Sequence, residues 1–212
     1  MSEISRYFEK QILQFDSSKV KIWFTSDTHW NHANIIKYCK RPFANVEEMD
    51  DALISNWNAV VDKGDHVYHL GDFCWGKKDD WIKYLKLLNG NIHIIKGNHD
   101  LKDYPSDVKK YIVEAVDYKE ITDCGRHVIM CHYPIMCYKA SYNPNCYMLH
   151  GHTHVTREQD FVEKWTKELK GSKQTNSDSC GNIINVGCMM SWMQYQPRTL
   201  DEIIEGSKTN AK

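Results

Sequence analysis

The sequence lacks several features that would assign it to a class at once. No apolar run approaches the about 20 residues that a membrane-spanning helix needs. The first 15 residues contain acidic side chains and no apolar stretch of the secretory kind, which favours a cytoplasmic protein without a membrane partner. Internal repeats, low-complexity tracts and linkers are also missing. We therefore expect one domain over residues 1–212, with a core from about residue 20 to 205.

The chain also lacks an excess of charge of either sign. Its 27 Lys and Arg residues stand against 28 Asp and Glu residues, which gives a formal net charge of −1. Without a basic cluster, strong non-specific binding to nucleic acid is disfavoured, although a local basic face stays open. The oligomeric state is not indicated by these features.

Pairs of closely spaced cysteines are missing as well. The chain has eight cysteines but no C-x-x-C pair, which argues against a structural zinc ribbon. In a chain of this length without a secretion signal, we expect free buried thiols rather than disulfides.

The apolar residues, 42% of the chain, predict strands and helices that alternate in the first half and consecutive strands in the second. We expect strands at 20–25, 65–71, 91–96, 146–150 and 182–187, several strands between 111 and 134 with a hairpin turn at 123–125, helices at 3–15, 32–40, 45–61, 79–90 and 157–173, and a frayed tail from 205. Asn45 is the expected N-cap of its helix, with Glu48 three residues on. This order predicts two sheets packed together with helices outside.

Several expected strands end in polar residues that can bind metals. These are Asp27-Thr28-His29, Gly71-Asp72, Gly97-Asn98-His99-Asp100, His132 and Gly151-His152-Thr153-His154. Ligands gather outside the carboxyl ends of strands in open α/β sheets, and oxygen and nitrogen donors suit Mn²⁺, Fe or Zn²⁺. On extended backbone, the spacings Asp-x-His and His-x-His would put both side chains of a pair on one side.

The ordered set D-x-H, G-D, G-N-H-D, H and G-H-x-H resembles the calcineurin-like metallophosphoesterase superfamily. The stretches "FTSDTHWNHANIIKYCKRPF" and "INVGCMMSWMQYQPRTLDEII" are similar to a small bacterial and phage branch of it. The resemblance implies an α/β (α+β) fold, a four-layer α/β/β/α sandwich of two mixed sheets flanked by helices. It also implies a phosphoesterase that uses two divalent metal ions, with Mn favoured and Fe, Zn, Ni or Co as alternatives.

The resemblance further implies a role for each matching residue. The implied metal ligands are Asp27, His29 and His154 for one ion, Asn98, His132 and His152 for the second, and Asp72 as a bridge. In the family a hydroxide that bridges the ions attacks phosphorus in line with the leaving oxygen, as in other two-metal sites. His99 would stabilise the phosphoryl oxygens or give a proton to the leaving group, and Asp100 would orient His99 or brace the loop.

Other residues near these motifs are weaker candidates. His32, Tyr133 and Arg157 could contact the substrate, with helix-start, packing or surface roles as the alternatives. His69 and His93 lie within strand patterns, so we expect them to be structural. Residues 157–179 directly follow the last motif, and this segment could form a lid over the substrate or a surface insertion.

The sequence departs from the phosphoprotein phosphatases of the superfamily, many of which continue G-D with x-x-D-R-G. Here the run is "GDFCWG" at 71–76, so Trp75 stands in place of the second acid and the phosphate-gripping Arg is absent. An Arg fork suits a terminal phosphate dianion. Its absence favours a phosphodiesterase acting on a small nucleotide-like or cyclic nucleotide substrate. The alternatives are a phosphomonoesterase and a metal-binding scaffold with weak catalysis.

Overall fold

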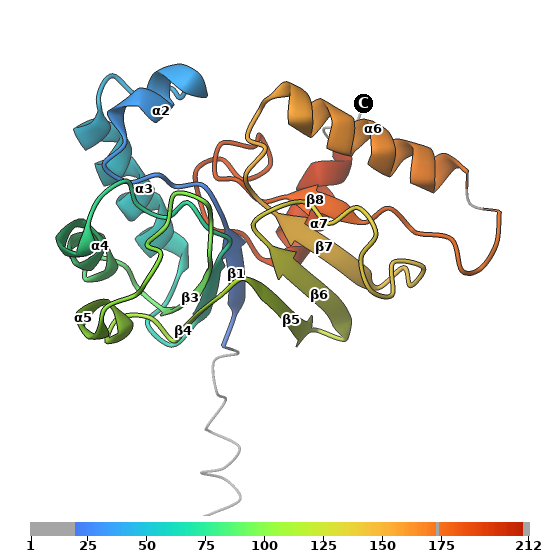
Figure 1. The fold of residues 1–212 in the computed structure, drawn as a ribbon, viewed down its shortest axis with the longest axis horizontal. Coiled ribbons are helices and arrows are strands. Elements are labelled where there is room, and N and C mark those ends of the chain that lie inside the picture. Colours follow the sequence, from blue (N-terminus) through green and yellow to red (C-terminus); the bar gives the residue numbers. More distant parts are fainter. Residues whose placement is uncertain (1–19, 173, 210–212) are drawn as a thin grey trace, which may run out of the picture.

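The structure, a computed structural model, describes residues 20–172 and 174–209. Its strands form two four-stranded sheets with helices on their outer sides, which is the predicted four-layer arrangement (Figure 1). The elements are β1 (Ile22–Thr25), α2 (Ala33–Tyr38), α3 (Val46–Val60), β2 (His66–His69), α4 (Lys78–Leu85), β3 (Asn91–Ile95), α5 (Ser106–Lys109), β4 (Glu114–Val116), β5 (Tyr118–Asp123), β6 (Arg126–Cys131), β7 (Cys146–His150), α6 (Arg157–Gly171), β8 (Ile183–Asn185) and α7 (Leu200–Thr209). The helix expected at 3–15 lies outside the described residues.

The first sheet has the strand order β1-β2-β3-β4, and all of its neighbours are parallel. We expected two mixed sheets, so this sheet is more regular than predicted. Parallel strands cannot be joined by a tight hairpin and need a crossover connection. Here a helix lies in each connection between the strands of the first sheet, which allows all of them to be parallel. As a result, all four strands deliver the residues that follow them to the same edge of the sheet.

The second sheet, β5-β6-β7-β8, is mixed as expected. Its antiparallel pair β5–β6 is joined by the predicted hairpin turn, where Cys124 and Gly125 have φ values of 48° and 77°. Two successive positive φ values are typical of the turns that match strand twist. The pairs β6–β7 and β7–β8 are parallel.

Two apolar clusters hold the layers together. The larger one includes Leu53 of α3, Ile94 of β3 and Met130 of β6, so it joins both sheets to the helices of the first. Ile129 faces the opposite way, as alternation along a strand requires, and packs in the smaller cluster with Val162 of α6. Helix α6 of the 157–179 segment therefore covers the outer face of the second sheet (Figure 1).

Local expectations hold for one helix start and fail for the tail. The Asn45 side chain accepts a hydrogen bond from the backbone N–H of Glu48 at 2.8 Å, so the N-cap of α3 is confirmed. The frayed tail expected from residue 205 is wrong as far as Thr209, the end of α7. Ile203 is fully buried and Gly206 packs closely against Trp192, so tertiary packing stabilises the segment.

The histidines inside strands are structural, as expected. His69 Nε2 lies 2.9 Å from Thr28 Oγ1, and His93 Nδ1 lies 2.8 Å from Glu114 Oε1. Cys39, Cys74, Cys146 and Cys188 are buried free thiols, as expected. Burial was wrongly expected for Cys124 and Cys137, which are exposed; Cys124 lies at the tip of a hairpin. No helix in the described part of the chain is long and apolar enough to cross a membrane.

Candidate metal centre

The predicted metal ligands meet where strands of both sheets end. They follow β1, β2, β3, β6 and β7 directly, and these strands carry their carboxyl ends to one region. Their donor atoms form two groups. The fold brings together residues more than 100 positions apart in the sequence, such as Asp27 and His154.

The first group consists of Asp27, His29 and His154. His154 Nε2 lies 3.1 Å from Asp27 Oδ1 and 3.3 Å from His29 Nε2. One donor atom from each of these residues and from Asp72 can be chosen so that all lie within 4.8 Å of one another. A set of carboxylates and imidazoles this compact could hold one metal ion.

The second group consists of Asn98, His132 and His152. His132 Nε2 lies 3.0 Å from Asn98 Oδ1, and the rings of His132 and His152 are 5.1 Å apart. Asp72 joins the groups, because its Oδ2 lies 3.5 Å from His29 Nε2 and 3.6 Å from His132 Nε2. One carboxylate thus stands between two sets of donors.

The backbone is left-handed at five of the seven candidate ligands, which the sequence analysis did not anticipate. The residues and their φ values are Asp27 55°, His29 52°, Asp72 55°, His152 66° and His154 47°. The extended-backbone explanation for the paired spacings is therefore wrong, although the paired side chains do converge. Non-glycine residues with this conformation each cost about 1–3 kcal/mol and cluster at functional sites.

Two glycines make room for the carboxylates. A Cβ at Gly97 would collide with the Asp72 carboxylate, and a Cβ at Gly151 would collide with the Asp27 carboxylate and the Ser26 hydroxyl. Because glycine has no Cβ, both positions allow the carboxylates to lie directly against the backbone.

Buried groups behind the donors fix their orientation. Arg41 donates from Nη2 to the Asp27 carbonyl at 2.6 Å and from Nη1 to the Thr28 carbonyl at 2.8 Å. His132 Nδ1 donates to the Leu70 carbonyl at 2.7 Å, which leaves Nε2 free to bind a metal. The sequence analysis missed Arg41, which no spacing rule in the sequence marks.

A thiol also reaches the site. Cys39 Sγ lies 2.9 Å from His154 Nδ1, on the side of the ring opposite to Asp27. Cys39 lies in the helix expected at 32–40, and from the sequence we expected only a buried thiol there. Contact with the imidazole can hold the ring so that Nε2 faces the other donors.

The site is electrostatically arranged for a cation. Burial raises the pKa of Asp72, and the neighbouring Asp27 charge raises it further. For Asp27, burial acts upward, but hydrogen bonding and charge from His154 outweigh it and hold the pKa below its ordinary value. For His154, burial acts downward, yet Asp27 and Cys39 raise the pKa to about 10. A metal ion could take the place of the proton that this imidazole carries.

His99 and Asp100 have different surroundings. The His99 ring is exposed and lies 5.8 Å from the His29 ring, while its backbone N–H donates to Asp72 Oδ1 at 2.8 Å. The Asp100 carboxylate accepts from the N–H groups of Gly97 (2.8 Å), Phe73 (2.8 Å) and Asp72 (3.2 Å). This geometry favours the loop-bracing role for Asp100 over orientation of His99.

The three weaker candidates lie in three different places. His32 is the N-cap residue of α2, and its ring is 5.4 Å from that of His29. Tyr133 is 47% exposed and its ring lies 4.6 Å from that of His152. The structure does not bring Arg157 to the donors; its guanidinium lies over the Phe161 ring of α6.

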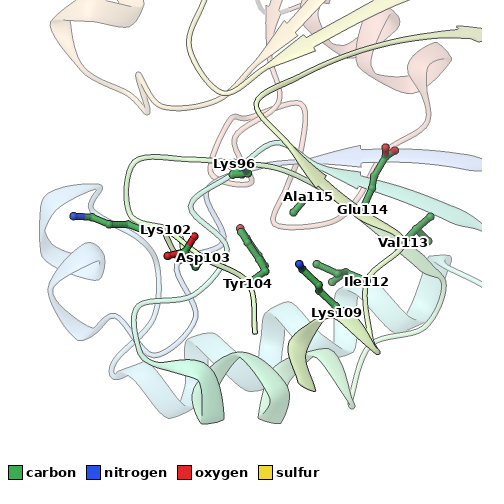
Figure 2. A pocket seen from close by; sticks show the side chains of 9 residues that line it. All are labelled: Lys96, Lys102, Asp103, Tyr104, Lys109, Ile112, Val113, Glu114 and Ala115. Atoms are coloured by element: carbon green, nitrogen blue, oxygen red, sulfur yellow. The ribbon is translucent and has the colours of Figure 1, made fainter. Parts of the chain in front are cut away.

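A cavity of about 350 Å³ opens beside the first donor group. Its lining residues are His29, His32, Asn34, Ile35, Tyr38, Cys39, Trp75, His99, His154 and Thr156. A separate cavity of about 380 Å³ lies around Tyr104, Lys96 and Lys109 (Figure 2). None of the predicted site residues lines that second cavity, so the chemistry belongs to the first.

Comparisons with known proteins identify the class. A model of the calcineurin-like phosphoesterase superfamily domain matches residues 20–200. The uncharacterized protein MJ1445 of Methanocaldococcus jannaschii is 37% identical over 189 residues, covering 87% of this chain and 90% of that protein. The Gene 66 protein of Mycobacterium phage D29 is 29% identical over 158 residues, covering 63% of this chain and 78% of the phage protein. The chain therefore belongs to the calcineurin-like phosphoesterase superfamily.

A solved structure is similar as well. The protein of unknown function AQ665 from Aquifex aeolicus matches with a TM-score of 0.63 and 27% identity, covering 88% of this chain and 99% of that one. The family and the cluster of Asp27, His29, Asp72 and His154 together support a metal-dependent phosphoesterase, a hydrolase of phosphoric esters. The bacterial and phage branch expected from the sequence fits these relatives, which also include an archaeal one.

Proposed function

We propose that this protein is a phosphodiesterase that uses two divalent metal ions, with Mn²⁺ favoured and Fe, Zn, Ni or Co as alternatives. The observation that carries the proposal is the position of Asp72 between two groups of donors. In this assignment Asp27, His29 and His154 hold one ion, Asn98, His132 and His152 hold the second, and Asp72 bridges them. Two such ions supply an activated water and a clamp on the phosphoryl oxygens.

The residues of the chain have separate tasks in this proposal. The carboxylates of Asp27 and Asp72 offset two of the four positive charges, while the neutral amide of Asn98 leaves net positive charge for an anionic phosphate. The exposed His99 imidazole lines the cavity beside the metal centre, where it can donate a proton to the leaving oxygen. Asp100 keeps the loop of Asn98 and His99 against the loop of Asp72.

The choice of a diester rests on the charge of the cavity. Neither Lys nor Arg is among the described residues that line it. The guanidinium of Arg41, which lies behind the donors, is buried and donates to two backbone carbonyls. A phosphomonoester dianion would have no fork of donors to bind its extra charge, whereas a diester monoanion needs none.

The cavity volume favours a small substrate. About 350 Å³ lies within the range of pockets that bind small molecules and is close to its lower end. We therefore favour a small nucleotide-like or cyclic nucleotide substrate over a long nucleic acid.

The test compares hydrolysis of bis-p-nitrophenyl phosphate, a diester, with that of p-nitrophenyl phosphate, a monoester, in Mn²⁺ and after chelation. Bound metal is measured on the same samples. We expect Mn²⁺-dependent activity with diester preference, loss of metal and activity in Asp72→Ala, and a fall of about 10²–10⁴-fold in turnover with retained metal in His99→Ala. Asp79→Ala, at a 91% exposed side chain, and His127→Ala, near the amino-terminal end of β6 and away from the His132 end, are the matched controls.

Each outcome decides a separate part of the proposal. Absence of Mn²⁺-dependent activity on both substrates would refute the enzyme and favour the weakly catalytic scaffold. Monoester preference would overturn the diester assignment alone. Full turnover of His99→Ala would show that this imidazole is not the proton donor.

A further inference from the structure

The cavity beside the metal centre has an aromatic wall that the family motifs do not explain. Trp75 stands where many phosphoprotein phosphatases of the superfamily have an acid, and its side chain is 45% exposed. The indole stacks on the His32 imidazole, with ring centroids 4.3 Å apart and an interplanar angle of 12°. An exposed tryptophan that is held parallel to a second ring offers a preformed flat surface on which a planar ligand can stack.

The backbone around this tryptophan is fixed. The Trp75 N–H donates to the Trp30 carbonyl at 2.8 Å, and the Asn31 side-chain amide donates to the Trp75 carbonyl at 3.1 Å. Trp30 is fully buried, so the loop that carries Trp75 is anchored to the core. A rigid aromatic side chain loses little conformational entropy when a ligand stacks on it.

The aromatic wall leads directly to the reacting groups. The rings of Trp75 and His99 are 5.0 Å apart, and the cavity is continuous from Trp75 to His29 and His154. On α2, Tyr38 is 73% exposed and also lines the cavity. No Asp, Glu, Lys or Arg is among the described lining residues, so this end of the cavity is suited to an uncharged planar group.

We propose that this cavity is a binding subsite for a planar heterocycle carried by the substrate, such as a nucleobase, which stacks on Trp75. His32 holds the indole in place and Tyr38 bounds the subsite on the side of α2. The inference rests on the proposed function, since the phosphate of the same substrate would lie on the metal centre. It names the chemical class of the substrate and adds Trp75 as a residue that determines specificity.

The test uses two ligands that share a phosphorylated ribose and differ by the base. AMP and ribose 5-phosphate are titrated by calorimetry into the Mn²⁺-loaded protein, and quenching of tryptophan fluorescence is recorded. Base–aromatic stacking predicts that AMP binds at least about tenfold more tightly than ribose 5-phosphate. In Trp75→Leu this ratio should fall at least about fivefold, whereas Trp75→Phe should keep most of it. Trp165→Leu, which removes a similarly exposed tryptophan on α6, should keep the wild-type ratio.

The outcomes separate this inference from the proposed function. Equal affinity for the two ligands, or an unchanged ratio in Trp75→Leu, would overturn the subsite even if bis-p-nitrophenyl phosphate is hydrolysed. Failure of hydrolysis would refute the enzyme, while the binding ratio would still decide whether Trp75 contacts a base. Retained Mn²⁺ binding by Trp75→Leu verifies that the variant is folded. If it is not folded, the quenching of tryptophan fluorescence by AMP decides the question, because Trp75→Phe should lose that quenching only if the base stacks on Trp75.

Discussion

Asp100 gives the most direct test of how the two active-site loops are held together. Its Oδ2 accepts from the N–H groups of Gly97 and Asp72, and its Oδ1 accepts from Phe73. In Asp100→Asn one oxygen becomes an amide that cannot accept. The least costly orientation gives up the single bond to Phe73. A hydrogen bond to a charged group contributes about 1.5–3 kcal/mol, but Asp100→Asn also removes a buried charge, which offsets part of that loss. We therefore expect a net loss of about 1 kcal/mol of unfolding free energy at pH 7.

The pH dependence provides a second signature of the same carboxylate. Burial raises the pKa of Asp100 from 3.8 to about 6. The folded state therefore takes up a proton at a higher pH than the unfolded state, and the wild type gains stability as the pH falls from 6 toward 3.8. Asp100→Asn lacks this gain. The difference between the two proteins should widen by about 1 kcal/mol between pH 7 and pH 5.

Urea unfolding of the metal-free proteins, followed by tryptophan fluorescence at both pH values, measures these differences. Asp103→Asn is the control, because Asp103 is exposed and a surface change costs at most about 0.5 kcal/mol. We also expect Mn²⁺ affinity to fall about 10–100-fold in Asp100→Asn, as for other groups that orient ligands. Equal stability of Asp100→Asn and wild type at both pH values would refute the bracing role.

Three further predictions concern the buried framework. Burial lowers the pKa of His69 to about 3, so the folded state resists the proton that the unfolded state takes up below about pH 6.5. The wild type should therefore lose up to about 1.4 kcal/mol of unfolding free energy per pH unit as the pH falls below about 6.5, and His69→Gln should remove this loss. Urea unfolding at pH 7 and 5 measures it, and an equal pH dependence in variant and wild type would contradict the argument. Gly151→Ala should lower the unfolding free energy by about 1–3 kcal/mol and weaken Mn²⁺ binding, because the added Cβ collides with Asp27. Gly64→Ala is the control, because its Cβ meets open space. Equal effects of the two substitutions would contradict the packing argument. Ile203→Ala should cost about 2–5 kcal/mol in thermal or urea unfolding, whereas a negligible cost would mean that α7 is not part of the core.

Local sequence determined the elements whose signals lie within a few residues. Asn45 and Glu48 predicted the start of α3, and Asp123-Cys124-Gly125 predicted the β5–β6 hairpin, because caps and tight turns depend on neighbouring residues. The alternation of strands and helices predicted the layers. The tail was predicted poorly, since α7 depends on burial of Ile203 against residues distant in the sequence.

The types and order of the candidate ligands were also readable from the sequence, because each motif is short and follows a strand. Their mutual geometry was not. The left-handed backbone at Asp27 and His154, and the approach of Asp72 to both donor groups, arise where the two packed sheets bring the carboxyl ends of their strands together. Sequence spacing cannot specify such positions, since it constrains only neighbours along the chain.

Tertiary structure alone decided which further side chains reach the site. Cys39 contacts a histidine 115 positions away, and the His32 ring stacks on Trp75 from a different loop. In the sequence, Cys39 was one apolar residue among others and Trp75 only a departure from a motif. Contacts between segments far apart in the chain form only when the fold brings them together, and here they turn an unexplained tryptophan into the wall of a cavity.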